Sequence, residues 1–547
     1  MAELIVENAR VYTGCEERPW AGWFTVTGGR VTTLGDGAPP AVPGAARLDA
    51  QGAFVMPGLV DVHNHHAIAG RADLFELTFT ADTGFAGILD AVRRWCADLG
   101  PDEWVLGGNW GSGLVSEISR ESSRQALDVA AGGRPVMLTD DSHHNRWANS
   151  RALELAGITE QSPGSGLLRD PDTGHLSGVL LEDAGLPVQE AVSATWVLTA
   201  QQQMRACARA VEMLHAYGIT AFQDAGVSTD IMAALQALDQ RGELNAWVVS
   251  SLLINDPIFG FKPVGRELMA VGSRYRSEHH FPTFVKIFLD GVPPTRTAAF
   301  LDPYLPDADH GDHFRGQTLM PQDELEGWLL EAAALGYSAK VHCTGDASVR
   351  ALLDAVAAVR AAGYGDLIYH VAHGQFVSAE DIPRFAQLGV CADISPFLWT
   401  PGIIPCAIAK VLPENRALQM QPNRLLDQAG ALIAGGSDWP VSDTPDVWQG
   451  IAGLVTRADP DRVFPGTLWA EQALGLDEAI AVFTRNGARA MGLEQETGQL
   501  TAGRAADFVI LNHDPFSLDK DELASVKVAE TWFAGQRVYQ SPEAAGA

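Results

Sequence analysis

The chain has 547 residues, of which 46% are hydrophobic and 19% are charged, and this length allows one large domain together with a smaller domain or an insertion. A net charge of −30 without a basic stripe excludes a nucleic acid partner; the charge indicates solubility, and steering of cationic substrates is the alternative. The six cysteines form no CxxC pair, no apolar stretch reaches the roughly 18 residues of a membrane helix, and the first residues lack the pattern of a signal peptide, so we expect a cytoplasmic protein without a disulfide framework or a membrane partner.

Short strands separated by turn residues are predicted at both ends of the chain. The N-terminal strands are expected at residues 3–6, 10–13, 23–27 and 30–34. The C-terminal strands are expected at residues 508–511, 526–533 and 536–539. Because two β-rich ends enclose a long middle, we predict one small β-sandwich domain built from residues 1–57 and 493–547.

The middle of the chain, residues 58–492, alternates apolar strands with amphipathic helical stretches, which is typical of a parallel α/β fold. Eight strands are predicted, at residues 59–65, 219–224, 246–253, 284–290, 338–343, 367–373, 390–395 and 432–438. Eight such units fit a closed (β/α)8 barrel of the TIM type.

Residues 66–218, between the first two barrel strands, are far too long for an ordinary βα connection. They contain elements of their own, including strands at 104–107 and 135–139 and a helix at 200–216. We therefore expect a large insertion after the first barrel strand, lying over the mouth of the barrel.

The first barrel strand ends in His63-Asn64-His65. Residues two apart on a strand point to the same side, so both imidazoles are expected to face one point. Histidine is a common zinc ligand, and two packed or surface histidines are the alternative. His66 has the opposite parity and is not expected to bind a metal.

Lys286 lies within the apolar strand 284–290. A charged amine is costly to bury, and burial lowers its pKa. A neutral amine can add CO2 and become a carbamate, an anionic ligand able to bridge two metal ions. A lysine that reaches solvent or forms a salt bridge is the alternative.

Three further strand ends carry candidate ligands: His342, His373 and Asp438. His370 has the opposite strand parity to His373 and is expected to be a packed residue or to support a ligand. Asp438 could bind a metal and take a proton from water, and a turn or helix-capping aspartate is the alternative. Together with the earlier residues, these side chains are expected at the carboxyl face of the barrel, where active sites of such barrels lie.

Several segments add to this pattern, at residues 56–61, 135–138, 147–153, 169–174, 178–180 and 498–511. With the strand-end residues they resemble the amidohydrolase superfamily (amidohydrolase family 3), in the branch of YtcJ-like proteins and N-substituted formamide deformylases. The resemblance extends over nearly the whole chain.

The resemblance implies a site for two divalent ions, with zinc as the expected metal and CO2 required for carboxylation of a lysine. The ligands of the first ion would be His63, His65 and Asp438. The ligands of the second ion would be His342 and His373, and carboxylated Lys286 would bridge the two ions.

The implied activity is hydrolysis of a C–N bond in a small amide-type substrate, such as an N-substituted formamide, an N-acyl amine, a carbamate or a cyclic imide, with an ester as a further option. A metal-bridging hydroxide would attack the carbonyl carbon. Asp438 would accept a proton and pass it to the leaving amine. Besides the small-molecule substrate, a second copy of the chain in a homodimer is one expected partner.

Substrate selection is expected to depend on the insertion and on the loops around the barrel mouth, because aromatic walls around a few polar groups are typical of small-molecule pockets. The candidates are His143, His144, Asn145, Trp147, Trp110, Asp290, Asp346, Phe397 and Trp439. This sequence departs from the branch at His143, where glycine is usual, and at His66.

Two other functions are considered. A mononuclear deaminase of the same superfamily predicts a glutamate three residues after a histidine ligand, whereas the residues here are Gly345 and Phe376. A non-catalytic binding or regulatory protein on the same fold predicts the loss of a ligand, whereas all six positions are filled.

Overall fold

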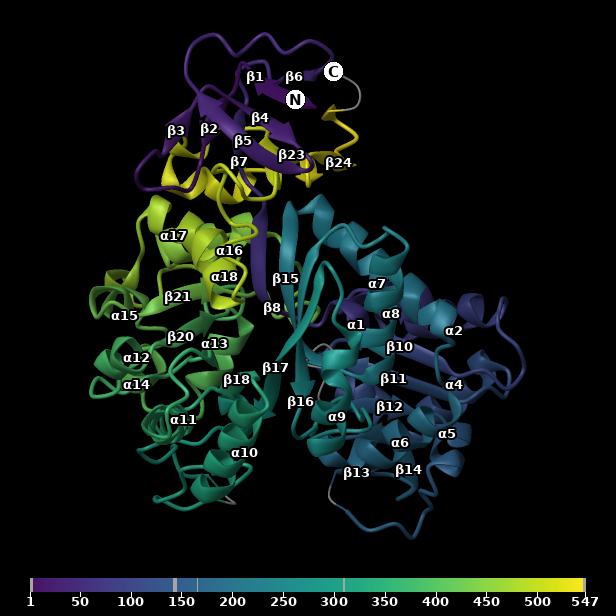
Figure 1. The fold of residues 1–547 in the computed structure, drawn as a ribbon. Coiled ribbons are helices and arrows are strands. Elements are labelled where there is room, and N and C mark those ends of the chain that lie inside the picture. Colours follow the sequence, from purple (N-terminus) through teal and green to yellow (C-terminus); the bar gives the residue numbers. More distant parts are fainter. Residues whose placement is uncertain (1–2, 141–144, 165, 308–309, 545–547) are drawn as a thin grey trace. The chain divides into compact units, whose positions relative to one another are not determined.

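The computed structural model describes residues 3–140, 145–164, 166–307 and 310–544, which form two compact units (Figure 1). The first unit combines Met1–His66, Ala210–Pro257 and Phe261–Ala547. The second unit consists of Ala67–Arg209 with Ile258–Gly260. The long segment between the first two barrel strands therefore has a compact fold of its own.

Eight parallel strands make up the central sheet of the first unit, and each pairs with the next along the chain. They are β8 (Leu59–Asn64), β15 (Ile219–Val227), β16 (Trp247–Leu253), β17 (His280–Phe288), β18 (Ser338–Cys343), β19 (Tyr369–His373), β20 (Val390–Ile394) and β21 (Leu432–Gly435). The backbone N–H of Asp438 donates to the carbonyl of His63 at 2.7 Å, and that of His65 donates to the carbonyl of Trp439 at 2.7 Å. These bonds join the last strand to the first, and the predicted (β/α)8 barrel is confirmed.

Helices surround these strands, as the alternating pattern predicted. They are α8 (Thr229–Gln240), α9 (Arg266–Gly272), α10 (Gln322–Ala334), α11 (Asp346–Ala361), α12 (Ile382–Leu388), α13 (Ile403–Ile408), α14 (Glu414–Ala417), α15 (Asn423–Gln428), α16 (Val447–Thr456), α17 (Leu476–Val482) and α18 (Arg485–Ala490). On α11, for example, Val349, Leu352, Val356 and Val359 are buried at spacings of three and four residues, which gives the helix one apolar face toward the barrel.

Strands from the two ends of the chain, purple and yellow in Figure 1, lie side by side in the β-sandwich. One sheet contains β5 (Arg30–Gly35), β4 (Trp23–Thr27), β1 (Leu4–Glu7) and β6 (Ala46–Asp49). The other contains β24 (Gln536–Gln540), β23 (Val528–Phe533), β22 (Phe508–Leu511), β7 (Phe54–Pro57), β2 (Arg10–Tyr12) and β3 (Trp20–Ala21). Between the sheets, Phe24 meets Phe508 edge to face at 5.2 Å, so both chain ends contribute to one core.

The second unit contains a six-stranded mixed sheet with helices packed on it. Its strands, in spatial order, are β13 (Leu167–Arg169), β14 (Leu176–Leu180), β12 (Arg146–Ala148), β11 (Val136–Asp140), β10 (Val105–Trp110) and β9 (Leu77–Thr78). Its helices are α2 (Phe85–Cys96), α3 (Val115–Ile118), α4 (Glu121–Ala131), α5 (Ser150–Leu155) and α6 (Leu186–Thr195), while α1 (His66–Phe75) and α7 (Ala200–Ala216) each run across a boundary between the units. Its placement over the barrel mouth stays a prediction.

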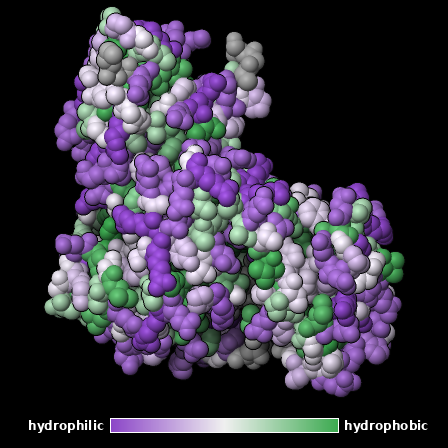
Figure 2. Space-filling model, turned by 45° about the vertical axis from the view of Figure 1, so that its right-hand side comes forward, coloured by the Kyte–Doolittle hydropathy of each residue, from purple (hydrophilic) through white to green (hydrophobic). Residues whose placement is uncertain are grey.

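The face drawn in Figure 2 is mostly hydrophilic, and its hydrophobic residues gather in small separate groups. Among the described helices, none combines the length and apolar character needed to cross a membrane.

Candidate metal centre

The six candidate ligands all lie at or just beyond the carboxyl ends of five barrel strands. They are buried, with exposed fractions of 0% for His63, 5% for His65, 1% for Lys286, 8% for His342, 4% for His373 and 7% for Asp438. The alternation of side chains along a strand explains why His63 and His65 face the same point. A barrel brings the remaining strand ends to the same rim.

His63, His65 and Asp438 form a group whose ligand atoms all lie within 4.8 Å of one another. Nε2 of His63 and Nε2 of His65 lie 3.4 Å and 3.5 Å from Oδ1 of Asp438. Nε2 of His63 is buried and makes no hydrogen bond to a described residue. Two imidazoles and a carboxylate are a typical donor set for zinc, so these residues fit a divalent ion.

His342 and His373 continue this group. The ring of His373 lies 4.7 Å from the ring of His63 and 4.7 Å from the ring of His342. Nε2 of His342 donates to the carbonyl of Gly291 at 3.1 Å, which leaves Nδ1 with the lone pair that a metal needs. Nδ1 of His373 lies 3.1 Å from Oγ of Ser395, which leaves Nε2 for a ligand. Such partners orient histidine ligands in metal sites.

Two of the strand ends have unusual backbone geometry. His373 has a φ of 70° and Asp438 a φ of 58°, in the left-handed region that residues other than glycine rarely occupy. The left-handed turn at His373 breaks the strand alternation, so His373 reaches the metal centre although His370 also lies inside the barrel. Backbone strain of this kind often occurs at functional sites.

Lys286 makes no hydrogen bond or ion pair to the described residues, and its amine lies 4.8 Å from the centre of the Phe288 ring. Burial, together with the charge of Lys340, lowers the pKa of Lys286 to about 8. Its register partner on the next strand, Lys340, instead donates to Asp393 and His370. A buried salt bridge, the alternative considered for Lys286, is thus found at Lys340. Lys286 has no carboxylate partner among the described residues.

Burial keeps three imidazoles of the site, those of His63, His342 and His373, neutral. Burial, together with the charge of Lys286, lowers the pKa of His63 to about 3 and the pKa of His342 to about 4. Burial alone would raise the pKa of Asp438, but the hydrogen bond from His65 helps to lower it below its ordinary value. Neutral imidazoles and an ionised carboxylate are the protonation states that bind metal ions.

Three of the candidate substrate residues of the insertion lie within the described residues: Trp110, Asn145 and Trp147. Trp110 and Trp147 are fully buried in the hydrophobic core of the second unit, so they pack rather than line a pocket. Asn145 donates from Nδ2 to Asp140 at 2.7 Å. His143 and His144 lie outside the described residues.

The candidates on the barrel loops differ in what they contact. Asp290 accepts hydrogen bonds from the backbone of Ala299, Thr344 and Gly345, so its carboxylate braces the ends of β17 and β18. Asp346 accepts from the backbone of Leu301.

Phe397 is half-buried and Trp439 is 6% exposed. Trp439 directly follows Asp438, and its carbonyl accepts from the backbone of His65. Trp439 is therefore hydrogen-bonded through its backbone to the candidate ligand His65.

Three residues that contact the candidate ligands or their partners were not among the sequence candidates. Asp393 and Lys340 lie in the apolar strands β20 and β18, fully buried, and the signal that singled out Lys286, a charge within an apolar strand, also applies to them. Asp61 accepts hydrogen bonds from the backbone of His63 and from the backbone and hydroxyl of Ser437. It therefore holds the two ligand-bearing loops together.

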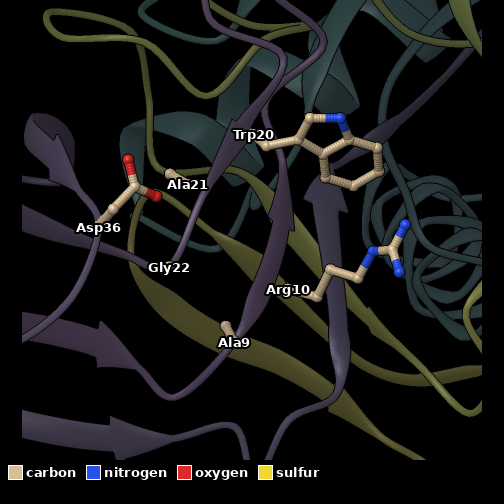
Figure 3. A pocket seen from close by; sticks show the side chains of 6 residues that line it. All are labelled: Ala9, Arg10, Trp20, Ala21, Gly22 and Asp36. Carbon is tan, nitrogen blue, oxygen red and sulfur yellow. The ribbon is translucent and has the colours of Figure 1, made fainter.

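A hollow in the β-sandwich does not compete with this site. It is lined by Ala9, Arg10, Trp20, Ala21, Gly22 and Asp36 (Figure 3). The one cation among these lining residues, Arg10, is half exposed, pairs with Asp514 at 2.7 Å and lies over the Trp20 ring at 4.7 Å. The candidate metal-binding side chains therefore lie at the barrel rim and not in this hollow.

Comparisons with known proteins agree with this geometry. A sequence profile described as the amidohydrolase family matches residues 47–539. The chain is 28% identical to N-substituted formamide deformylase of Arthrobacter pascens, with 99% of each chain covered. It is 26% identical to YtcJ of Bacillus subtilis (strain 168), named as an amidohydrolase, with 91% of each chain covered.

Among solved structures, an uncharacterised metal-dependent hydrolase of Pyrococcus furiosus superposes with a TM-score of 0.74 at 21% identity. The match covers 94% of this chain and 100% of that chain. The likeness therefore extends over nearly the whole fold of this chain.

Proposed function

The chain belongs to the amidohydrolase family, as its motifs predicted, and on that premise we propose that it is a metal-dependent hydrolase cleaving a C–N bond of a small amide-type substrate. The observation that carries the proposal is the buried group of His63, His65 and Asp438 beside His342 and His373. N-substituted formamides come first among the candidate substrates because a deformylase is similar over nearly the whole chain. N-acyl amines, carbamates and cyclic imides follow.

The proposed site holds two divalent ions, with zinc as the expected metal. His63 would bind through Nε2, together with His65 and Asp438. His342 would bind through Nδ1, together with His373. When bound, such ions lower the pKa of water toward roughly 7 and polarise a carbonyl oxygen, which supplies a nucleophile at neutral pH.

Lys286 is proposed as the anionic bridge between the two halves of the site. Its buried amine has no acidic partner among the described residues, and its neutral form is accessible near neutral pH. The amine nitrogen would bond to the carbon of CO2 and release one proton, which gives a carbamate. The carbamate then supplies two oxygen atoms, and the buried charge of the ammonium disappears.

Asp438 is the proposed general base and acid. Its carboxylate is ionised and lies beside two imidazoles. It would accept a proton from the attacking water as the oxygen–carbon bond forms. It would then donate that proton to the nitrogen as the C–N bond breaks, because an unprotonated amine is a poor leaving group. For a formamide the products are formate and the free amine.

The test is a substrate panel with zinc-loaded protein. One amine is presented as its N-formyl, N-acetyl and carbamate derivatives, next to a cyclic imide and a matching formate ester. We expect release of the amine from the formamide, loss of that activity with a chelator, and recovery when zinc is returned. His342→Ala should lose both the activity and bound metal. Turnover of the ester alone, or C–N cleavage that survives complete metal removal, would contradict the proposal.

A further inference from the structure

Four fully buried side chains form one hydrogen-bonded chain below the metal centre: His370, Lys340, Asp393 and His63. Nε2 of His370 donates to the carbonyl of Ala490 at 2.8 Å, and its Nδ1 lies 3.1 Å from Nζ of Lys340. Lys340 also donates to Oδ2 of Asp393. The same oxygen lies 3.1 Å from Nδ1 of His63. This series of hydrogen bonds thus ends on the candidate ligand His63.

The acceptor groups beside His370 and His63 assign the ring proton of each histidine. A carbonyl only accepts, so His370 carries its proton on Nε2 and accepts from Lys340 with Nδ1. Nζ of Lys340 donates to Oδ2 of Asp393 in a fully buried ion pair, so Asp393 is a carboxylate and only accepts. His63 therefore carries its proton on Nδ1. Its Nε2 keeps the lone pair and lies 3.4 Å from Oδ1 of Asp438.

A structural role alone poorly explains the buried ion pair of Lys340 and Asp393. Burying an ion pair costs desolvation that an apolar pair of similar size would avoid. Asp393 also uses a single oxygen for both donors, and its Oδ1 makes no hydrogen bond to a described residue. A carboxylate kept only for stability would be expected to satisfy both oxygens.

We propose that Lys340 and Asp393 are positioning residues that fix His63 as an Nε2 metal ligand. Asp393 sets the tautomer and the ring orientation of His63, and Lys340 holds Asp393 in place from the neighbouring strand. Partners of this kind typically change metal affinity by about 10- to 100-fold when they are removed. The inference rests on the proposed function, because it assumes that His63 binds a metal.

The first test measures metal binding without any substrate. Apo protein and its Asp393→Asn variant are titrated with Zn²⁺ in competition with a chelating dye. We expect the dissociation constant of at least one ion to rise about 10- to 100-fold in the variant. The control is Asp507→Asn, because Asp507 is equally buried but accepts from Trp247, Thr497 and Ala534 outside this chain of hydrogen bonds. An equal affinity in wild type and Asp393→Asn would overturn the proposal.

The second test reads the tautomer of His63 in metal-free protein labelled with ¹⁵N-histidine, with the signal assigned by its loss in His63→Asn. We expect the Nδ1–H form in the wild type and loss of this preference in Asp393→Asn. The wild-type measurement needs no variant, so it decides the point even where Asp393→Asn does not fold. A wild-type His63 protonated on Nε2 would overturn the proposal. The expected tautomer in a protein that binds no metal would contradict the proposed function instead.

Discussion

Asp438 contacts His63 twice, through a backbone hydrogen bond and through a close approach of the side chains. Its N–H donates to the carbonyl of His63 at 2.7 Å, and its Oδ1 lies 3.4 Å from Nε2 of the same histidine. The backbone bond belongs to the seam where the last barrel strand meets the first. The spacing of these two candidate ligands is therefore set by closure of the barrel, so a change at the seam should affect both stability and metal binding.

Gly436 allows this close approach. A Cβ built on Gly436 would lie 2.3 Å from Cβ of His63 and 2.7 Å from its backbone nitrogen. Neither atom can move without shifting β8. We expect Gly436→Ala to lower the melting temperature and the metal content together, measured by thermal unfolding and elemental analysis. Gly327→Ala is the control, because a Cβ there meets nothing within 4 Å. A variant at Gly436 with wild-type stability and metal content would show that the seam does not set the ligand spacing.

Asp438→Asn should separate chemistry from metal binding. The amide keeps the shape of the side chain but cannot carry the proton to the leaving nitrogen. We expect kcat to fall by about 10²- to 10⁴-fold, the range typical of general acid–base groups. Metal analysis of the same sample verifies that ions are still bound. If the metal-loaded variant keeps most of its kcat, Asp438 is a ligand without a role in proton transfer.

Acid should destabilise the metal-free protein because several buried histidines stay neutral when folded. The pKa of His63 is about 3 and that of His342 about 4, both lowered mainly by burial from an ordinary value of 6.5. Below pH 6.5 the unfolded chain takes up protons that the folded protein does not, so the free energy of unfolding falls as the pH drops toward 4. Each such histidine contributes about 1.4 kcal/mol per pH unit.

Urea unfolding of chelator-treated protein between pH 7.5 and 4.5 measures this slope. His342→Asn removes one of the titrating groups and should therefore give a shallower slope. A free energy of unfolding that stays constant across this range, or an unchanged slope in His342→Asn, would show that these histidines do not titrate as inferred.

Trp147 is expected to matter for stability rather than for substrate choice. It is fully buried in the core of the second unit and its ring lies 6.0 Å from the ring of Phe85. Trp147→Ala should cost about 3–5 kcal/mol, which is typical when a buried aromatic side chain is truncated, and urea unfolding measures the loss. Unchanged stability together with altered relative kcat/KM values among substrates would restore Trp147 as a substrate-binding residue.

The barrel, and the position of the candidate ligands at its strand ends, could be predicted from the sequence because both depend on local rules. Strand alternation places His63 and His65 on one side, and the order of strands in a barrel brings the remaining ends to one rim. The left-handed backbone of His373 was not predictable, because it depends on how the loop after β19 packs. For the same reason parity alone could not show that His370 and His373 both lie inside the barrel.

The surroundings of the buried lysines and tryptophans depend on residues that are distant in the sequence. Lys286 and Lys340 are both lysines in apolar strands, and only the fold shows that Asp393 pairs with Lys340. Trp110 and Trp147 could equally have lined a pocket or filled a core, and their complete burial decides for the core. Composition and periodicity contain no information on such long-range contacts.

Variants of Lys286 distinguish a metal-bridging carbamate from a buried amine most clearly. Under the two-metal proposal, wild-type protein purified without a chelator should contain about two divalent ions per chain. Lys286→Ala removes an anionic ligand from between two cations, which would then repel each other across the gap. We expect the variant to remain folded, to lose most of its activity and to retain at most one ion. Elemental analysis and circular dichroism on one sample measure both properties.

Chemical rescue distinguishes a lost ligand from a general disturbance of the barrel. Formate or acetate fits the space that Lys286→Ala vacates and supplies the missing carboxylate, so it should restore part of the metal content and part of the activity. Lys286→Met is the matched control: its side chain fills the same space without an anion, so neither acid should rescue it. If Lys286→Ala keeps both ions and most activity, Lys286 is not a ligand. If both acids restore Lys286→Met as well as Lys286→Ala, they act elsewhere, and the carbamate is excluded as the reason for rescue.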